Sequence, residues 1–219
     1  MSERALRIEV PGRGAVSALL TEATGGDWLF VYAPGAGSSL NDPFGEYAAR
    51  ILPEAGIAVL RFQFPYQEAK RSGPDRNDVL EASWRAAIET ARSETGGRRI
   101  VAAGRSMGGR IASQVVAAGE AVDALALFAY PLHPPGNPAQ MRDAHLPSIT
   151  VPALFCSGTR DAFASPDELA AAASMVRRST VHMLQAADHG FAAPKSAGGR
   201  EGVWREACEA LVEFLRALG

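Results

Sequence analysis

Short runs of apolar residues alternate along the chain with longer segments in which apolar residues recur every three or four positions. The short runs are typical of β-strands, and the longer segments are typical of helices with one buried face. Several runs are apolar almost throughout, as expected for strands covered on both faces of a parallel sheet. The pattern predicts strands at 5–10, 15–21, 28–33, 58–62, 99–103, 124–129, 153–157 and 180–184.

Helices are predicted to fall between these strands. The segment 78–93 carries Leu80, Trp84 and Ile88 along one face. Ser165 and Glu168 have the spacing of a capping box, so a further helix is predicted to begin there. The other predicted helices are 44–52, 107–118 and 203–218. Strands alternating with helices indicate an α/β fold, with a mostly parallel central sheet and helices on both faces.

Size and composition favour one domain that spans residues 1–219. Hydrophobic residues make up 47% and charged residues 21%, which is an ordinary globular balance. The net charge is -2, so we expect no nucleic-acid partner and no binding to an anionic membrane. No secretory signal is visible, and no run reaches the roughly 18–20 apolar residues that span a bilayer. We therefore expect a cytoplasmic protein, with a homodimer left open as its oligomeric state.

The two cysteines carry no recognisable chemistry. Cys156 lies in an apolar predicted strand and Cys208 in a predicted helix, and neither has metal-ligand spacing. They are interpreted as free, buried thiols, which suits a reducing compartment. We expect no metal and no cofactor. The glycine-rich segment at 34–37 lacks a following Gly-Lys-Ser/Thr, so a phosphate-binding loop is disfavoured.

The segment 104–108 matches the pattern G-x-S-x-G, with Ser106 at its centre. The pattern alone is weak, but here it follows a predicted strand and precedes a predicted helix, which is the context it requires. Gly104 and Gly108 would remove the side chains that collide where a strand turns directly into a helix. Ser106 is therefore the candidate nucleophile.

A serine hydroxyl needs a base to accept its proton. His189 follows the last predicted strand, at the carboxyl edge where open α/β sheets place ligands. His182 lies within that strand and is interpreted as structural, while His133 and His145 lie in the proline-rich segment 131–152. His189 is the candidate base; the alternative is a solvated loop histidine.

A carboxylate is expected to orient the histidine. Asp161 follows the strand 153–157 and lies at the same sheet edge. Asp143, late in the preceding connection, is the alternative, and Asp188 adjoins His189 but is expected to diverge from it. The order Ser, Asp, His along the chain is the one that α/β-hydrolases use.

A tetrahedral intermediate needs two N–H donors aimed at its oxygen. Met107 N–H and Ala36 N–H are the candidates, with Gly37 as the alternative to Ala36. The candidate substrate-binding residues are Gly35, Gly37, Phe64, Tyr66 and His133, with core packing as the alternative for the aromatic residues. Leu132 is a further candidate wall residue, and Arg71, Asp75 and Arg76 are candidates for the rim.

Over nearly its whole length the chain resembles the α/β-hydrolase superfamily. The resemblance is carried by PGAG (34–37), RFQFPY (61–66), GRSMGG (104–109), YPLHPPG (130–136), GTRD (158–161) and DH (188–189). More narrowly it resembles the compact predicted-hydrolase branch related to dienelactone hydrolases. That branch also includes the hydrolase-like domain of a regulatory subunit of the nuclear NSL acetyltransferase complex. The resemblance implies the α/β-hydrolase fold and the Ser106, Asp161, His189 triad, although dienelactone hydrolases proper use a cysteine nucleophile.

Two functions from different classes follow. The leading one is a serine hydrolase of the carboxylesterase or thioesterase type, which cleaves a small-molecule ester through an acyl-enzyme on Ser106. The same residues would also serve a peptidase or amidase. The alternative is a non-catalytic interaction module on a hydrolase fold. The connection 130–151 is too short for a cap domain, so an open cleft that prefers short acyl chains is expected.

Overall fold

The computed structural model describes residues 2–219, whose eight strands form one sheet in the order β1-β2-β4-β3-β5-β6-β7-β8. Strand β2 pairs antiparallel with its neighbours β1 and β4, and all later neighbours in the order are parallel. The strands are β1 (Glu3–Val10), β2 (Gly14–Thr21), β3 (Trp28–Ala33), β4 (Ile57–Phe62), β5 (Arg99–Arg105), β6 (Ala124–Phe128), β7 (Ala153–Gly158) and β8 (Ser179–Leu184). All eight predicted strands are present, with bounds that shift by at most two residues.

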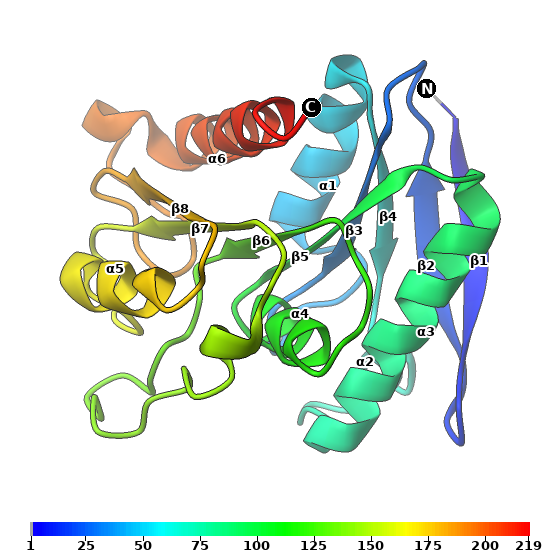
Figure 1. The fold of residues 1–219 in the computed structure, drawn as a ribbon, viewed down its shortest axis with the longest axis horizontal. Helices are drawn as coiled ribbons and strands as arrows, with labels where there is room; N and C mark the ends of the chain where they lie inside the picture. Colours follow the sequence, from blue (N-terminus) through cyan, green and yellow to red (C-terminus); the bar gives the residue numbers. More distant parts are fainter. Residues whose placement is uncertain (1) are drawn as a thin grey trace.

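Helices cover both faces of this sheet, as predicted (Figure 1). On one face α1 and α6 pack against the strands, and on the other α3, α4 and α5 do so. The helices are α1 (Pro43–Ile51), α2 (Pro65–Glu68), α3 (Asn77–Thr95), α4 (Met107–Ala117), α5 (Pro166–Ser174) and α6 (Gly199–Arg216). Short 3₁₀ helices span Leu52–Ala55, Leu146–Ser148 and Lys195–Ala197.

Strand β3 shows why the central strands are apolar throughout. Leu29 and Val31 point into the core shared with α3 and α4, whereas Phe30 and Tyr32 point into the core shared with α1 and α6. Successive side chains of a strand face opposite sides, so a strand between two helical layers has no solvent-facing position.

The helix bounds differ from the predicted ones where local capping decides them. Ser165 and Glu168 form the predicted capping box at the start of α5. Helix α6 begins four residues before the predicted start, directly after Gly198 in a left-handed conformation. The single-turn helix α2 was not predicted, because four residues are too few to show a helical period.

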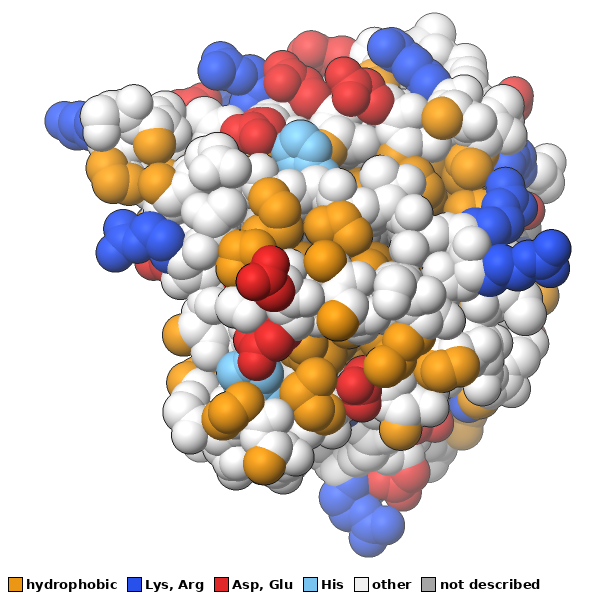
Figure 2. Space-filling model, turned by 60° about the vertical axis from the view of Figure 1, so that its left-hand side comes forward, with side chains coloured by type: hydrophobic (Ala, Val, Ile, Leu, Met, Phe, Trp, Pro, Cys, Tyr) orange, Lys and Arg blue, Asp and Glu red, His pale blue; other side chains and the backbone are white. Residues whose placement is uncertain are grey.

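The β6–β7 connection contains only the 3₁₀ helix Leu146–Ser148, so there is no cap domain between these two strands. Both cysteines are free and buried, as expected. None of the helices within residues 2–219 combines the length and the apolar character that crossing a membrane requires. On the face seen in Figure 2, acidic and basic side chains are both present and intermixed with apolar ones.

Candidate active site

Ser106 occupies the sharp turn between β5 and α4. Its backbone has φ 51° and ψ −118°, a strained conformation for a residue other than glycine. The turn brings backbone against backbone: a Cβ on Gly104 would lie 2.4 Å from the Gly109 nitrogen, and one on Gly108 would lie 2.2 Å from the Ala33 carbonyl oxygen. The two glycines are therefore steric requirements of the turn that presents the Ser106 hydroxyl above the sheet.

The structure brings Ser106, His189 and Asp161 together from three separate loops. His189 Nε2 lies 2.8 Å from Ser106 Oγ. On the other side of the ring, Nδ1 lies 2.9 Å from each carboxylate oxygen of Asp161. In this geometry the serine hydroxyl donates to Nε2 while Nδ1–H donates to the carboxylate, so the imidazole is oriented to accept the hydroxyl proton.

Packing and hydrogen bonds hold both partners of the serine in place. The Asp161 side chain is fully buried and also accepts from Ser157 Oγ and Phe163 N. The Phe163 ring stacks on the imidazole of His189, with 3.9 Å between centroids. Asp188, the residue next to His189, turns away and accepts from two backbone N–H groups of its own loop. The side chains of Asp188 and His189 therefore point in different directions, as expected.

A second serine–histidine pair lies nearby but has a different character. Ser113 Oγ lies 2.7 Å from His145 Nε2. The one Ser113 hydroxyl proton is directed to the Arg110 carbonyl, so the serine accepts from His145. Within residues 2–219 no carboxylate oxygen lies within 4.0 Å of His145, and burial followed by the Arg110 charge lowers the pKa of its imidazole. This pair therefore holds α4 to the 130–152 segment.

The remaining two histidines, His133 and His182, contact acidic side chains outside the site. His133 Nε2 lies 3.3 Å from Glu168, and its pKa is raised, first by the hydrogen bond to the Pro134 carbonyl. His182 Nε2 lies 3.0 Å from Glu206. Only His189 combines a serine on one ring nitrogen with a buried carboxylate on the other among the described histidines.

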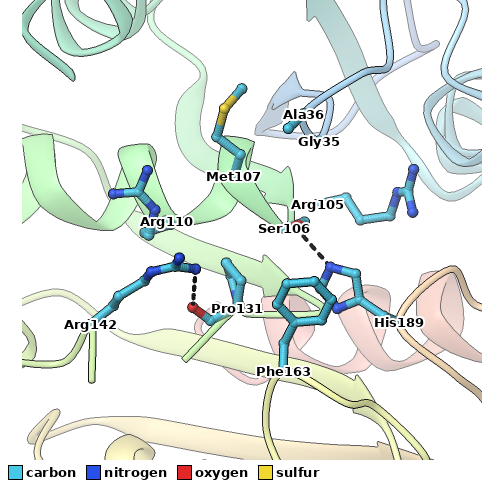
Figure 3. A pocket seen from close by; sticks show the side chains of 10 residues that line it. All are labelled: Gly35, Ala36, Arg105, Ser106, Met107, Arg110, Pro131, Arg142, Phe163 and His189. Atoms are coloured by element: carbon cyan, nitrogen blue, oxygen red, sulfur yellow. Dashed lines mark hydrogen bonds between the residues drawn. The ribbon is translucent and has the colours of Figure 1, made fainter. Parts of the chain in front are cut away.

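The loop after β3 lies against the serine. A Cβ on Gly35 would be 3.4 Å from Ser106 Cβ, which shows how closely the two backbones approach. Ala36 and Met107, the candidate oxyanion donors, both line the cavity in front of Ser106 (Figure 3). Met107 also begins helix α4, whose N-terminal end favours negative charge at this point.

A buried aspartate that the sequence analysis did not consider holds this loop. The Asp42 side chain is 2% exposed and N-caps α1 through Gly45 N. Its other partners are Tyr32 Oη at 2.7 Å, Ser38 Oγ at 2.8 Å and Arg105 Nη2 at 2.9 Å. Burial opposes ionisation, but Arg105 and these hydrogen bonds lower the pKa of Asp42 overall. The only sequence signal was the N-cap pair Asp42-Pro43.

The cavity in front of Ser106 has a volume of about 390 Å³. Its lining consists of Gly35, Ala36, Arg105, Ser106, Met107, Arg110, Pro131, Arg142, Phe163 and His189. Arg110 and Arg142 were not among the candidate residues, since a single arginine in a helix or loop resembles any solvated charge. The ten described residues of the lining include no aspartate or glutamate.

Of the five candidate substrate contacts, Gly35 alone lines this cavity. Phe64 is fully buried and packs edge-on against Phe62, so it belongs to the core and offers no surface to a substrate. Gly37 and Tyr66 border a separate depression beside the loop after β3. His133 is held by Glu168 outside the lining.

Two further groups of candidates lie away from the cavity. Leu132 is fully buried, although the neighbouring Pro131 does line the cavity. Arg71 pairs with Asp75, and Arg76 pairs with Asp78. None of these rim candidates is among the residues that line the cavity.

Comparison with known proteins identifies the family. Residues 26–216 match the family model described as an alpha/beta hydrolase domain. The chain is an α/β-hydrolase. The resemblance found in the sequence motifs is thereby confirmed, as is the predicted fold class.

Solved structures of low sequence identity share the fold of this α/β-hydrolase. A dienelactone hydrolase from Anabaena variabilis is 20% identical, with a TM-score of 0.78 over 99% of this chain and 97% of that one. A serine hydrolase without a lid from Xanthomonas campestris is 19% identical, with a TM-score of 0.75 over 100% and 95% of the two chains. A cold-adapted esterase from an Arctic intertidal metagenomic library is 18% identical, with a TM-score of 0.69 over 97% and 93%.

Proposed function

We propose that this α/β-hydrolase is a serine hydrolase that cleaves a small carboxylic ester or thioester through an acyl-enzyme on Ser106. The observation that carries the proposal is the continuous chain of contacts from Ser106 Oγ to His189 at 2.8 Å and from His189 to Asp161 at 2.9 Å. The nucleophile–base–carboxylate arrangement is the one that activates a serine hydroxyl.

In the first half of the reaction, Ser106 Oγ bonds to the substrate carbonyl carbon while its proton passes to His189 Nε2. Asp161 stabilises the imidazolium that forms. The carbonyl oxygen becomes an oxyanion, which the Ala36 and Met107 N–H groups stabilise at the positive end of α4. The bond to the leaving group then breaks, and the His189 proton passes to that group.

In the second half, a water molecule repeats the sequence. It gives one proton to His189 Nε2 and attacks the acyl carbon, and the bond to Ser106 Oγ breaks as the proton returns to the serine. The proposed steps balance with these side chains, the two backbone N–H groups and water. The cavity of about 390 Å³ suits a small substrate, and methylene groups that extend beyond it stay in water and gain none of the about 0.8 kcal/mol that burial of a CH₂ contributes. Short acyl chains are therefore expected to be preferred.

The test is hydrolysis of 4-nitrophenyl acetate and butyrate by the wild-type protein and by Ser106→Ala. Wild-type turnover that Ser106→Ala abolishes supports the proposal. Ser113→Ala is the matched control, since Ser113 also contacts a histidine at hydrogen-bond distance, and it should retain activity. A wild-type protein without turnover on any ester or thioester would contradict the proposal and favour the non-catalytic interaction module. The cytoplasmic location and the homodimer stay predictions.

A further inference from the structure

The charge of the cavity walls is one-sided although the protein as a whole carries a net charge of -2. Arg105, Arg110 and Arg142 line the cavity, and none of the other described lining residues is acidic. Arg105 is neutralised locally by Asp42, and Figure 3 shows its guanidinium pointing away from the other two. The cationic character of the cavity therefore comes from Arg110 and Arg142.

Among the described residues these two guanidiniums have no ionic partner. Within residues 2–219, neither lies within 4.0 Å of a carboxylate oxygen. Their side-chain contacts are to neutral oxygens: Arg110 to Gln114 Oε1 at 3.4 Å and Arg142 to the Pro131 carbonyl at 3.2 Å. Burial and then the Arg142 charge lower the pKa of Arg110, but a guanidinium keeps its charge at neutral pH. Two positive charges on one half-buried wall repel each other, and an anion bound between them would relieve this repulsion.

The Arg142 backbone is fixed before any substrate arrives. Its N–H donates to the Leu132 carbonyl at 2.8 Å, and its own carbonyl accepts from Tyr130 Oη at 2.8 Å. Arg110 stands on the first turns of α4, and its N–H donates to the Ser106 carbonyl at 3.0 Å. Both cations therefore stand on backbone that is tied to the site, so an anion that binds between them has only the two side chains left to order.

The position of Arg110 and Arg142 indicates which part of the substrate, the acyl group or the leaving group, they face. The leaving group must accept the proton from His189 Nε2, so it lies toward His189 and Phe163. Figure 3 shows Arg110 and Arg142 together on the opposite side of Ser106 from His189. The acyl group, which bonds to Ser106 Oγ, extends toward this pair.

We propose that the preferred substrate carries a carboxylate on its acyl group, as in the half-ester or half-thioester of a dicarboxylic acid, and that Arg110 and Arg142 bind this carboxylate. The inference rests on the proposed function of Ser106. A planar guanidinium matches a carboxylate in geometry, and charge-assisted hydrogen bonds are about twice as strong as neutral ones.

The experiment compares esters that differ in one charge. The 4-nitrophenyl half-esters of glutaric and adipic acid are paired with the corresponding methyl 4-nitrophenyl diesters, which are neutral. We expect kcat/KM to be higher by about tenfold or more for at least one half-ester, a ratio that falls as salt screens the charges. Arg110→Gln and Arg142→Gln should each lower this ratio by about fivefold or more. Arg13→Gln, in the exposed turn between β1 and β2, is the matched control and should leave the ratio unchanged.

The outcomes separate this inference from the proposed function. Equal kcat/KM for charged and neutral esters, with both dependent on Ser106, would overturn the carboxylate site and leave the hydrolase intact. A charge preference that persists in both arginine variants would also overturn it. A preference for 4-acetoxybenzoate over methyl 4-acetoxybenzoate, without one for the half-esters, would place the charge on the leaving group and refute the acyl assignment. If no ester is hydrolysed, the proposed function itself fails.

Discussion

Replacing Asp42 with asparagine tests the buried network that holds the loop beside Ser106. Asp42 Oδ2 accepts from Tyr32 and Gly45, and Oδ1 accepts from Ser38 and Arg105. Asparagine has the same shape but only one oxygen. If that oxygen keeps Tyr32 and Gly45, the amide NH₂ group faces the Arg105 guanidinium, and two donors then meet without an acceptor.

The cost can be worked from these contacts. A hydrogen bond to a charged group contributes about 1.5–3 kcal/mol, and removing one partner of a buried ion pair costs about 3–5 kcal/mol. The Arg105 side chain is 19% exposed and can recover part of its hydration, so we expect the free energy of unfolding to fall by about 2–3 kcal/mol. For a chain of this length that corresponds to a fall in Tm of roughly 4–12 °C.

Thermal and urea unfolding of the wild type and Asp42→Asn measure this change. The matched control is Asp78→Asn, whose side chain is 64% exposed and whose ion pair with Arg76 should contribute less than about 1 kcal/mol. Because the pKa of Asp42 is lowered in the folded protein, its ionisation stabilises the fold above the ordinary aspartate pKa of about 3.9. The stability difference should shrink as the pH falls below that value. An Asp42→Asn protein as stable as Asp78→Asn would refute the reasoning.

Three further predictions address the site and its support. Asp161→Asn should lower kcat by roughly 10³–10⁴, because the amide disturbs the His189 tautomer, and near-normal turnover would move the carboxylate role to another residue such as Asp143. Gly108→Ala should lower Tm sharply, because its Cβ would lie 2.2 Å from a backbone oxygen, whereas Gly202→Ala, with nothing within 4 Å, should be tolerated in α6. Burial opposes the ionisation of Glu68, but hydrogen bonds from neighbours including Gln63 lower its pKa to about 2. The wild type should therefore be more stable than Glu68→Gln by a constant free energy of unfolding above about pH 4.5, and acid unfolding should show this difference disappear toward pH 2.

The strands and most helices could be predicted from the sequence because the spacing of the apolar residues matches the faces that each element buries. Each central strand lies between two helical layers, so its apolar run is unbroken. The chain order of Ser106, Asp161 and His189 was equally informative, since the carboxyl ends of parallel strands meet at one sheet edge. Their meeting at one sheet edge follows from that topology, whereas the contact distances depend on the packing of Phe163 and the hydrogen bonds around Asp161.

The walls of the cavity could not be predicted in the same way. Phe64 and Tyr66 follow β4 and have the composition of a binding pocket, but only the packing of Phe62 and its neighbours shows that they turn inward. Arg110 and Arg142 are far apart in the sequence and meet through the fold of the 130–142 segment. The partners of Asp42 are likewise spread over three elements, which no local pattern reveals.

The measurement that tests the central claim most directly is labelling with a fluorophosphonate, followed by mass spectrometry of the intact protein and of its peptides. The account predicts one label for each chain, attached to Ser106, and none on Ser106→Ala, while Ser113→Ala is labelled like the wild type. Absence of labelling in the wild type, or a label on any other residue, would contradict the assignment of Ser106 as an activated nucleophile.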